Sequence, residues 1–129
     1  MNSEPSEASD KKMEMRKRTK AYASGIVRLY CSLPVGRSEI QILGRQALRS
    51  GTSVAANYRE ASRARSDADF ISKIETCAQE ADETSLWLEL LKEDCLVTSD
   101  RLELLLKETG ELIAIFVTMS KNVKKRRQQ

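Results

Sequence analysis

Apolar residues recur every three or four positions through most of the chain, which is the spacing of one face of an α-helix. The stretch from Ser38 to Arg65 shows this most clearly, with an apolar stripe made of Ile40, Leu43, Ala47, Gly51, Val54, Tyr58 and Ala61. Similar stripes run from Tyr22 to Leu33, from Phe70 to Leu91 and from Leu102 to Val123. The pattern therefore predicts four amphipathic helices.

Helix boundaries are marked by proline and by capping residues. Pro34 ends the first helix, because proline disfavours the helical conformation in the residue before it. Ser38 followed by Gln41, and Ser66 followed by Asp69, have the spacing of capping boxes and predict the starts of the second and third helices.

The fourth helix is predicted to begin at Ser99. Four long helices joined by short loops pack as an antiparallel up-down-up-down four-helix bundle, so the predicted fold class is all-α. We expect a disordered acidic tail over residues 1–10, the bundle over 11–124 and a basic tail over 125–129.

The last two helices carry more apolar surface than one small bundle needs. Leu106, Ile113 and Val117 widen the stripe of the fourth helix to roughly 200° of arc, about twice the usual width. Leu86 and Leu90 point away from the stripe of the third helix. Because uncovered apolar surface commonly marks an interface, these five residues predict a homo-oligomer.

The polar side of the second helix carries a row of arginines. At ~100° per residue, the four side chains lie within roughly 40° of one line. We call this set the arginine row: Arg45, Arg49, Arg59 and Arg63. Guanidinium groups match phosphate oxygens, so the row predicts a nucleic-acid-binding face. The alternatives are a solvated helix face or ion pairs with the acidic third helix.

A second basic block lies at the end of the chain, and its alternatives are a favourable interaction with the helix dipole and solubility. Arg65 follows the arginine row directly. The predicted nucleic-acid contacts are Arg45, Arg49, Arg59, Arg63, Arg65, Lys124, Lys125, Arg126 and Arg127.

The formal net charge of +3 conceals a strong asymmetry along the chain. Residues 66–112 contain 13 acidic and 4 basic side chains, whereas 11–20, 21–65 and 113–129 are each net basic. This predicts one basic and one acidic surface. No apolar run approaches the ~20 residues that span a bilayer, and the first ten residues do not resemble a signal peptide. We therefore expect a cytoplasmic protein without membrane contact.

Catalysis has little support. The chain has no histidine, which removes the commonest general base and zinc ligand. Ser50, Ser53 and Tyr58 therefore lack the usual partner of a nucleophile. The acids of the third helix leave a carboxylate magnesium site open, but ion pairs with the second helix or with a neighbouring subunit fit them better. We expect no enzyme activity, no cofactor and no metal.

Several short segments also resemble a bacterial family of four-helix-bundle proteins. The matching positions are Arg45-Gln46, Arg49-Ser50, Ser53-Val54-Ala55-Ala56-Asn57, Glu60, Asp69-Phe70, Glu80-Ala81-x-Glu83 and the run from Leu88 to Leu91. The family includes proteins encoded in intervening sequences of large-subunit ribosomal RNA genes, and the accessory variability protein of diversity-generating retroelements. Tyr58, Arg59 and Ala61 depart from its usual Ser-Ile-x-x-Asn-Ile-Ala-Glu-Gly segment.

The resemblance implies a ring-like homo-oligomer, commonly a pentamer, with basic surfaces. It also implies nucleic acid and a reverse transcriptase as partners of the retroelement members. The leading hypothesis is a non-enzymatic oligomeric bundle that binds the backbone of RNA or DNA. The alternative is a structural or protein-interaction module that binds an acidic protein or a reverse transcriptase.

Overall fold

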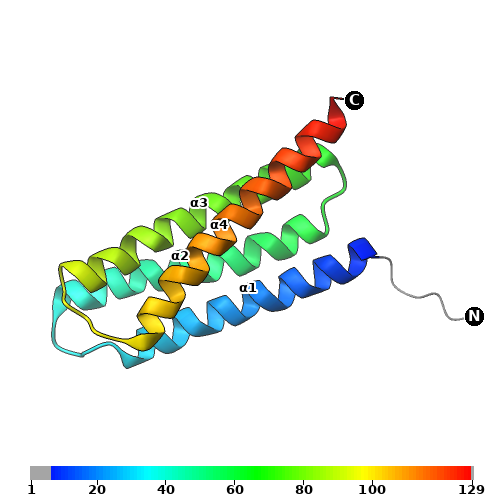
Figure 1. Cartoon of the computed structure of the whole chain (residues 1–129). Helices are drawn as coiled ribbons and strands as arrows, with labels where there is room; N and C mark the ends of the chain where they lie inside the picture. Colours follow the sequence, from blue (N-terminus) through cyan, green and yellow to red (C-terminus); the bar gives the residue numbers. More distant parts are fainter. Residues whose placement is uncertain (1–6, 129) are drawn as a thin grey trace, which may run out of the picture.

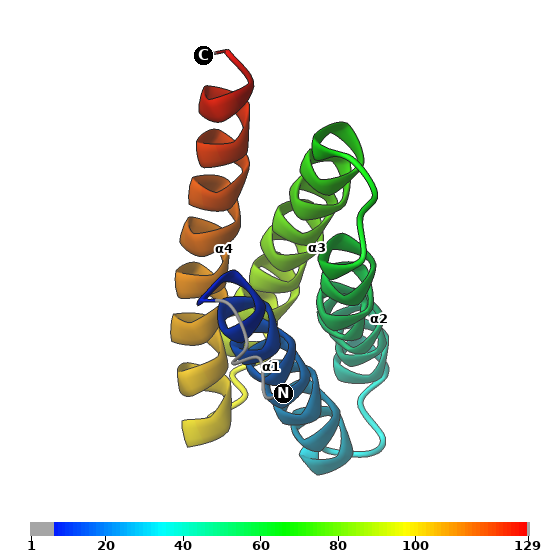
Figure 2. The same cartoon turned by 90° about the vertical axis from the view of Figure 1, so that its right-hand side faces the viewer.

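The computed structural model describes residues 7–128, which form four α-helices joined by short loops (Figure 1). The helices are α1 (Glu7–Ser32), α2 (Ser38–Ser62), α3 (Asp67–Glu93) and α4 (Asp100–Arg127). Each helix runs antiparallel to the next and packs against it, while α4 lies at an angle to α1 and contacts it less closely than it contacts α3 (Figure 2). The predicted all-α bundle is therefore confirmed.

The starts of α3 and α4 follow the predicted chemistry. The Ser66 hydroxyl accepts a hydrogen bond from the backbone N–H of Asp69 at 3.1 Å. The Ser99 hydroxyl accepts one from Leu102 at 3.2 Å. Each serine thereby satisfies one of the amide donors that a helix leaves open in its first turn.

The capping box predicted at the start of α2 is wrong. The N-cap residue is Arg37, which makes no side-chain capping bond, and Ser38 is already helical. The Gln41 side chain donates to the carbonyl of Pro34 at 2.9 Å. Its carboxamide is therefore engaged by the preceding loop and does not cap the helix.

Two helices extend past the boundaries predicted from the sequence. α1 begins at Glu7, so the last part of the expected disordered tail is helical, and residues 1–6 of it lie outside the described residues. α4 continues to Arg127, so most of the expected basic tail is helical. In both cases the charges suit the helix dipole, with acids in the first turn of α1 and bases in the last turn of α4.

The predicted apolar stripes form the core. Leu88, Leu102 and Leu112 are completely buried, one from α3 and two from α4. The rings of Tyr58 and Phe116 stack with centroids 6.3 Å apart and join α2 to α4 across the bundle. Burial of such side chains is the main source of stability in a bundle of this kind.

A layer of hydroxyl groups, one from each helix, crosses the middle of the core. The oxygens of Tyr22 and Thr109 are 2.6 Å apart, as are those of Ser50 and Thr84. Thr109 donates its own proton to the carbonyl of Leu105, so Tyr22 is the donor of the first pair. Burial raises the pKa of Tyr22 to about 12. Ser50, Thr84 and Thr109 also donate to carbonyls of their own helices, whereas the Tyr22 hydroxyl has Thr109 as its acceptor. The layer therefore favours this register, because only this alignment gives Tyr22 its acceptor.

Two glycines bring α1 and α2 close together. A Cβ atom at Gly51 would lie 2.8 Å from Cγ1 of Ile26, and one at Gly44 would lie 2.7 Å from Cδ1 of Leu33. The close approach expected at Gly51 is therefore confirmed. Gly44 escaped the sequence analysis, although it lies seven residues earlier on the same face.

We expect Gly51→Leu to destabilise the fold by ~1–3 kcal/mol, because the added side chain would displace the buried Ile26. Chemical denaturation measures this loss. Gly110→Ala is the matched control, since a Cβ there meets no atom within 4 Å and alanine favours the helix by about 1 kcal/mol. Unchanged stability in Gly51→Leu would mean that α1 and α2 do not meet at this glycine.

An ion pair connects α1 to α4 where their packing is sparse. Arg18 donates through Nε and Nη2 to the two carboxylate oxygens of Glu108, at 2.8 and 2.7 Å. These hydrogen bonds, and the charge of Arg18, hold the pKa of Glu108 below its ordinary value. A carboxylate with a lowered pKa stabilises the fold at neutral pH and loses that contribution as it becomes protonated.

We therefore expect Glu108→Gln to reduce stability at pH 7, and the difference from wild type to shrink in acid. The contribution is complete above the unfolded-state pKa of about 4.3 and disappears as the pH falls through the lowered folded-state value. Urea denaturation of both proteins between neutral and acidic pH measures it. A difference that is constant over this range would exclude the ion pair as its cause.

Candidate nucleic-acid interface

The arginine row is exposed on the outer side of α2, opposite the buried stripe. Its members differ in their partners. Arg49 donates to Glu80 at 3.4 Å and to Glu83 at 3.0 Å, both on α3. Hydrogen bonding and the charge of Glu83 raise the pKa of Arg49. The alternative of pairing with the third helix is therefore correct for this arginine, whose charge is compensated within the bundle.

The other three members of the row have no carboxylate oxygen within 4.0 Å among the residues that the structure describes. Arg59 and Arg63 lie at the end of α2, whereas Arg45 lies about 21 Å away along the axis, at 1.5 Å per residue. Within the arginine row, Arg45 is thus far from Arg59 and Arg63, and Arg49 differs from the other three because it is paired with acids of α3.

α1 contributes cations that the sequence analysis did not assign to a site. Arg16, Lys17, Lys20 and Met13 of α1 surround a hollow of about 210 Å³ together with Arg59 of α2. In the described part of the chain, no carboxylate lies within 4.0 Å of these cations. The antiparallel topology could have revealed this arrangement, because it aligns residues 11–20 with the end of the second helix.

The end of α4 supplies a third set of cations. Lys124 binds Glu75 of α3 at 2.7 Å, and this contact holds the pKa of Glu75 below its ordinary value. The remaining predicted residues of this block, Lys125, Arg126 and Arg127, are exposed. They make no ion pair with any described residue. Lys124 therefore holds α4 against α3, while the residues after it are available to a ligand.

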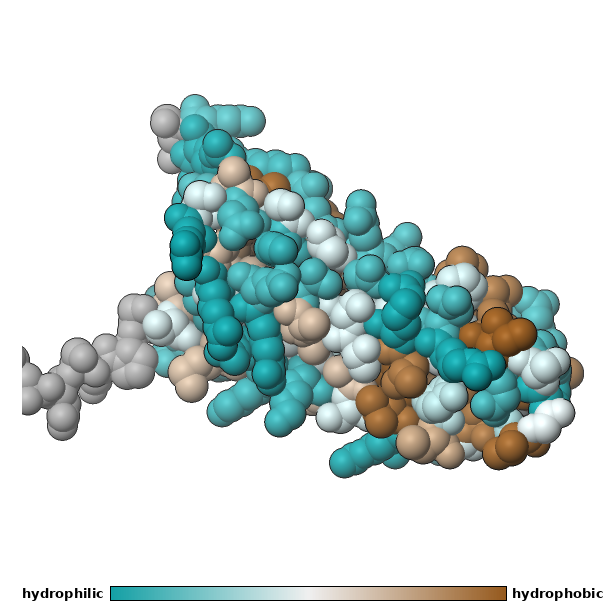
Figure 3. Space-filling model, turned by 180° about the vertical axis from the view of Figure 1, so that it is seen from behind, coloured by the Kyte–Doolittle hydropathy of each residue, from teal (hydrophilic) through white to brown (hydrophobic). Residues whose placement is uncertain are grey.

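These three sets meet at one end of the bundle, where α1 begins and where α2 and α4 end (Figures 1 and 2). Hydrophilic side chains dominate this end in Figure 3, whereas hydrophobic side chains gather at the opposite end. We call the unpaired cations here the basic end: Lys12, Arg16, Lys17, Lys20, Arg59, Arg63, Arg65, Lys125, Arg126 and Arg127.

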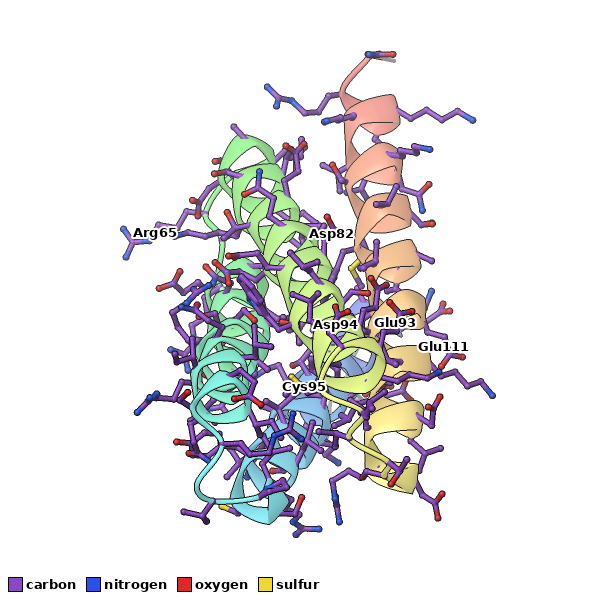
Figure 4. The ribbon with its side chains drawn as sticks, turned by 90° about the vertical axis from the view of Figure 1, so that its left-hand side faces the viewer. Arg65, Asp82, Glu93, Asp94, Cys95 and Glu111 are labelled. Atoms are coloured by element: carbon purple, nitrogen blue, oxygen red, sulfur yellow. The ribbon has the colours of Figure 1, made fainter. Side chains whose placement is uncertain are left out.

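Acidic side chains are concentrated on α3 and α4. In Figure 4 Arg65 projects into solvent from one side of the bundle, and Asp82, Glu93 and Glu111 lie around α3 and α4. The structure thus has the two charged surfaces that the sequence predicts. A phosphate backbone would approach the basic end and be repelled by the surface of α3.

The residues predicted to form an oligomer interface are only partly uncovered. Leu86 is 46% exposed and Val117 is 39% exposed. Leu90 is half-buried, and Leu106 and Ile113 pack partly against the core. The uncovered apolar area is therefore smaller than the arc of the fourth helix indicated, because part of that arc packs against the core.

Some reactive groups of the described residues are engaged in the fold, whereas the free thiol of Cys31 is exposed. Ser50 is bonded within the hydroxyl layer, and burial raises the pKa of Cys77 to about 12, which keeps it a thiol. Between residues 7 and 128, no three histidine, cysteine or acidic side chains are grouped so that they could hold a metal ion. None of the four helices has a segment apolar and long enough to cross a bilayer.

Comparisons with known proteins agree with this architecture. The model of the 23S rRNA-intervening sequence protein family matches residues 11–118. A similar solved structure is a protein of unknown function from the S23 ribosomal protein family of Bacteroides thetaiotaomicron VPI-5482. It is 37% identical, with a TM-score of 0.74, and the match covers 82% of this chain and 97% of that one. Comparison with curated proteins gives no match. The chain therefore belongs to the 23S rRNA-intervening sequence protein family.

Proposed function

We propose that this protein is a non-enzymatic, oligomeric four-helix bundle that binds the backbone of RNA or DNA through its basic end. The observation that carries the proposal is the convergence of cations from three helices on one end of the bundle, none of them paired with a carboxylate of the described chain. A cation that is paired with a carboxylate must leave that partner before it binds phosphate. An unpaired cation binds phosphate directly, and its binding releases only counterions from the nucleic acid.

The side chains suit phosphate contact more than base recognition. Six of the ten cations are arginines, whose guanidinium groups bind two phosphate oxygens at once. Apart from Met13, the hollow between α1 and α2 is lined by cations alone, with no neutral hydrogen-bonding side chain. We therefore expect affinity that depends on salt and differs little between nucleotide sequences.

Association of several copies would strengthen this binding, because linked basic ends engage one nucleic acid together. Leu86 and Val117 provide uncovered apolar surface, and Gly110 on the same side of α4 as Val117 leaves room for a close neighbour. The pentamer and the reverse transcriptase implied by the resemblance remain predictions.

A second candidate function is a protein-interaction module, and the end opposite to the basic end favours it. Val35 is 92% exposed and Leu96 is 76% exposed in the two loops of that end. Leu96 also has a φ angle of 57°, a conformation that is unfavourable for a branched apolar residue. Uncovered apolar side chains on loops of this kind suit a protein partner.

The triple variant Lys17→Gln, Lys20→Gln, Arg59→Gln tests the basic end. We expect it to fold normally, since exposed substitutions change stability by ~0.5 kcal/mol or less. Its affinity for duplex DNA should fall about equally for unrelated sequences. Its salt slope should decrease by about 0.9 for each phosphate that the variant no longer neutralises. Fluorescence anisotropy at several salt concentrations measures both.

The control is Arg28→Gln, Arg101→Gln, Lys107→Gln, which removes the same charge from exposed, unpaired residues away from the basic end. It should bind like wild type. Equal reductions of affinity in the two variants would show that only net charge matters. No binding by wild type at low salt would exclude the proposed function and leave the interaction module as the better candidate.

For oligomerisation, we expect native mass spectrometry of the wild type to give a multiple of the 14.6 kDa chain mass. Leu86→Glu with Val117→Glu should reduce the mass, because each change places a charge in the apolar surface. Leu104→Glu is the control, since that residue is 68% exposed on another side of α4. A wild type that is monomeric at micromolar concentration would contradict the prediction.

A further inference from the structure

Resting on the proposed function, we propose that a hollow at the basic end holds one unstacked nucleotide, so that the protein prefers single-stranded over duplex nucleic acid. The hollow measures about 370 Å³ and lies where the first turns of α1, the α2–α3 loop and the last turns of α4 meet. This volume is within the usual range of small-molecule sites.

The floor of the hollow is apolar. Ala61 and Val123 are buried, while Ala64 and Phe70 are partly exposed and line the hollow with them. Phe70 packs against the core on its other side, so its ring is held in place. A fixed aromatic ring beside small aliphatic side chains is a surface on which a base can stack, whatever its identity.

The rim of the hollow is cationic. Lys12 of α1, Arg65 of the α2–α3 loop and Arg126 of α4 all line it. None of the three has a carboxylate oxygen within 4.0 Å among residues 7–128. The guanidinium of Arg65 extends into solvent (Figure 4), where it can reach the phosphate that follows a bound nucleotide.

One acid also lines the hollow, and it argues for a nucleotide rather than a bare anion. Asp67 repels a phosphate group but accepts a hydrogen bond from an N–H group of a base. A base on the side of Asp67 and Phe70, with its phosphate toward Lys12 and Arg126, satisfies both groups. An acidic peptide would place carboxylates near Asp67 and would leave the apolar floor unused.

A second hollow, lined by cations, lies next to this one. The neighbouring hollow of Arg16, Lys17, Lys20 and Arg59 lies further along the same two helices, one turn and more beyond Lys12. A strand that leaves the nucleotide pocket along α1 and α2 therefore meets further unpaired cations. A duplex cannot enter in this way, because its bases are stacked and paired in the interior of the helix.

The test compares labelled oligo(dT) of about 12 nucleotides, a typical site size for single-strand binders, with a duplex of equal length. Wild type should bind the single strand more tightly. Ala64→Leu fills the hollow without changing charge and should weaken single-strand binding on the order of tenfold, the effect of removing one stacked base, with duplex binding unchanged. Ala21→Leu is the control, because that exposed residue of α1 lines a different hollow.

If Ala64→Leu fails to fold, Lys12→Gln with Arg126→Gln replaces it, and should weaken single-strand binding more than duplex binding. Equal binding of both nucleic acids by wild type, or equal effects of Ala64→Leu and Ala21→Leu, would overturn the nucleotide pocket and leave the proposed function intact. Displacement of oligo(dT) by polyglutamate of equal charge and at equal concentration would also overturn it. No binding of either nucleic acid would exclude both proposals.

Discussion

The antiparallel arrangement of the helices determines which charged side chains lie together at each end of the bundle. Short loops make each helix reverse the direction of the one before it, so the start of α1 and the ends of α2 and α4 share one end of the bundle (Figure 1). The hydroxyl pairs Tyr22–Thr109 and Ser50–Thr84 connect the helices in pairs and favour this register. Without this alignment Arg16 and Arg59 would not border the same hollow.

The concentration of cations at this end is costly for the fold, since unpaired like charges repel one another. Several cations along the bundle are compensated by acids. Arg18 binds Glu108, Arg49 binds two acids of α3, and Lys124 binds Glu75. Unpaired cations such as Arg28, Arg45 and Arg101 also occur elsewhere, but they are scattered. The gathering of ten unpaired cations at one end is what supports a ligand with the opposite charge. Phosphate binding thus requires unpaired cations at this end, whereas the stability of the fold would be greater without their mutual repulsion.

The fold could be predicted almost entirely, because apolar spacing and the caps at Ser66 and Ser99 are local signals that the packing reinforces. The site could be predicted only in part. The spacing of the arginine row correctly placed its members outside the core, but pairing depends on which helix lies alongside. The sequence alone therefore could not separate Arg49 from Arg59, although the predicted topology could have placed Arg16 beside Arg59. The start of α2 at Ser38 was predicted correctly, but its capping box was not, since Gln41 bonds to a loop carbonyl.

Photo-crosslinking of a 4-thiouridine-containing RNA to the wild-type protein, read out by mass spectrometry, tests the central claim most directly. It identifies the contacting residues without altering the protein. The account predicts crosslinked peptides from three segments that are distant in sequence, residues 8–20, 59–70 and 121–128. Crosslinks concentrated on residues 80–104, or an absence of crosslinks at low salt, would contradict it.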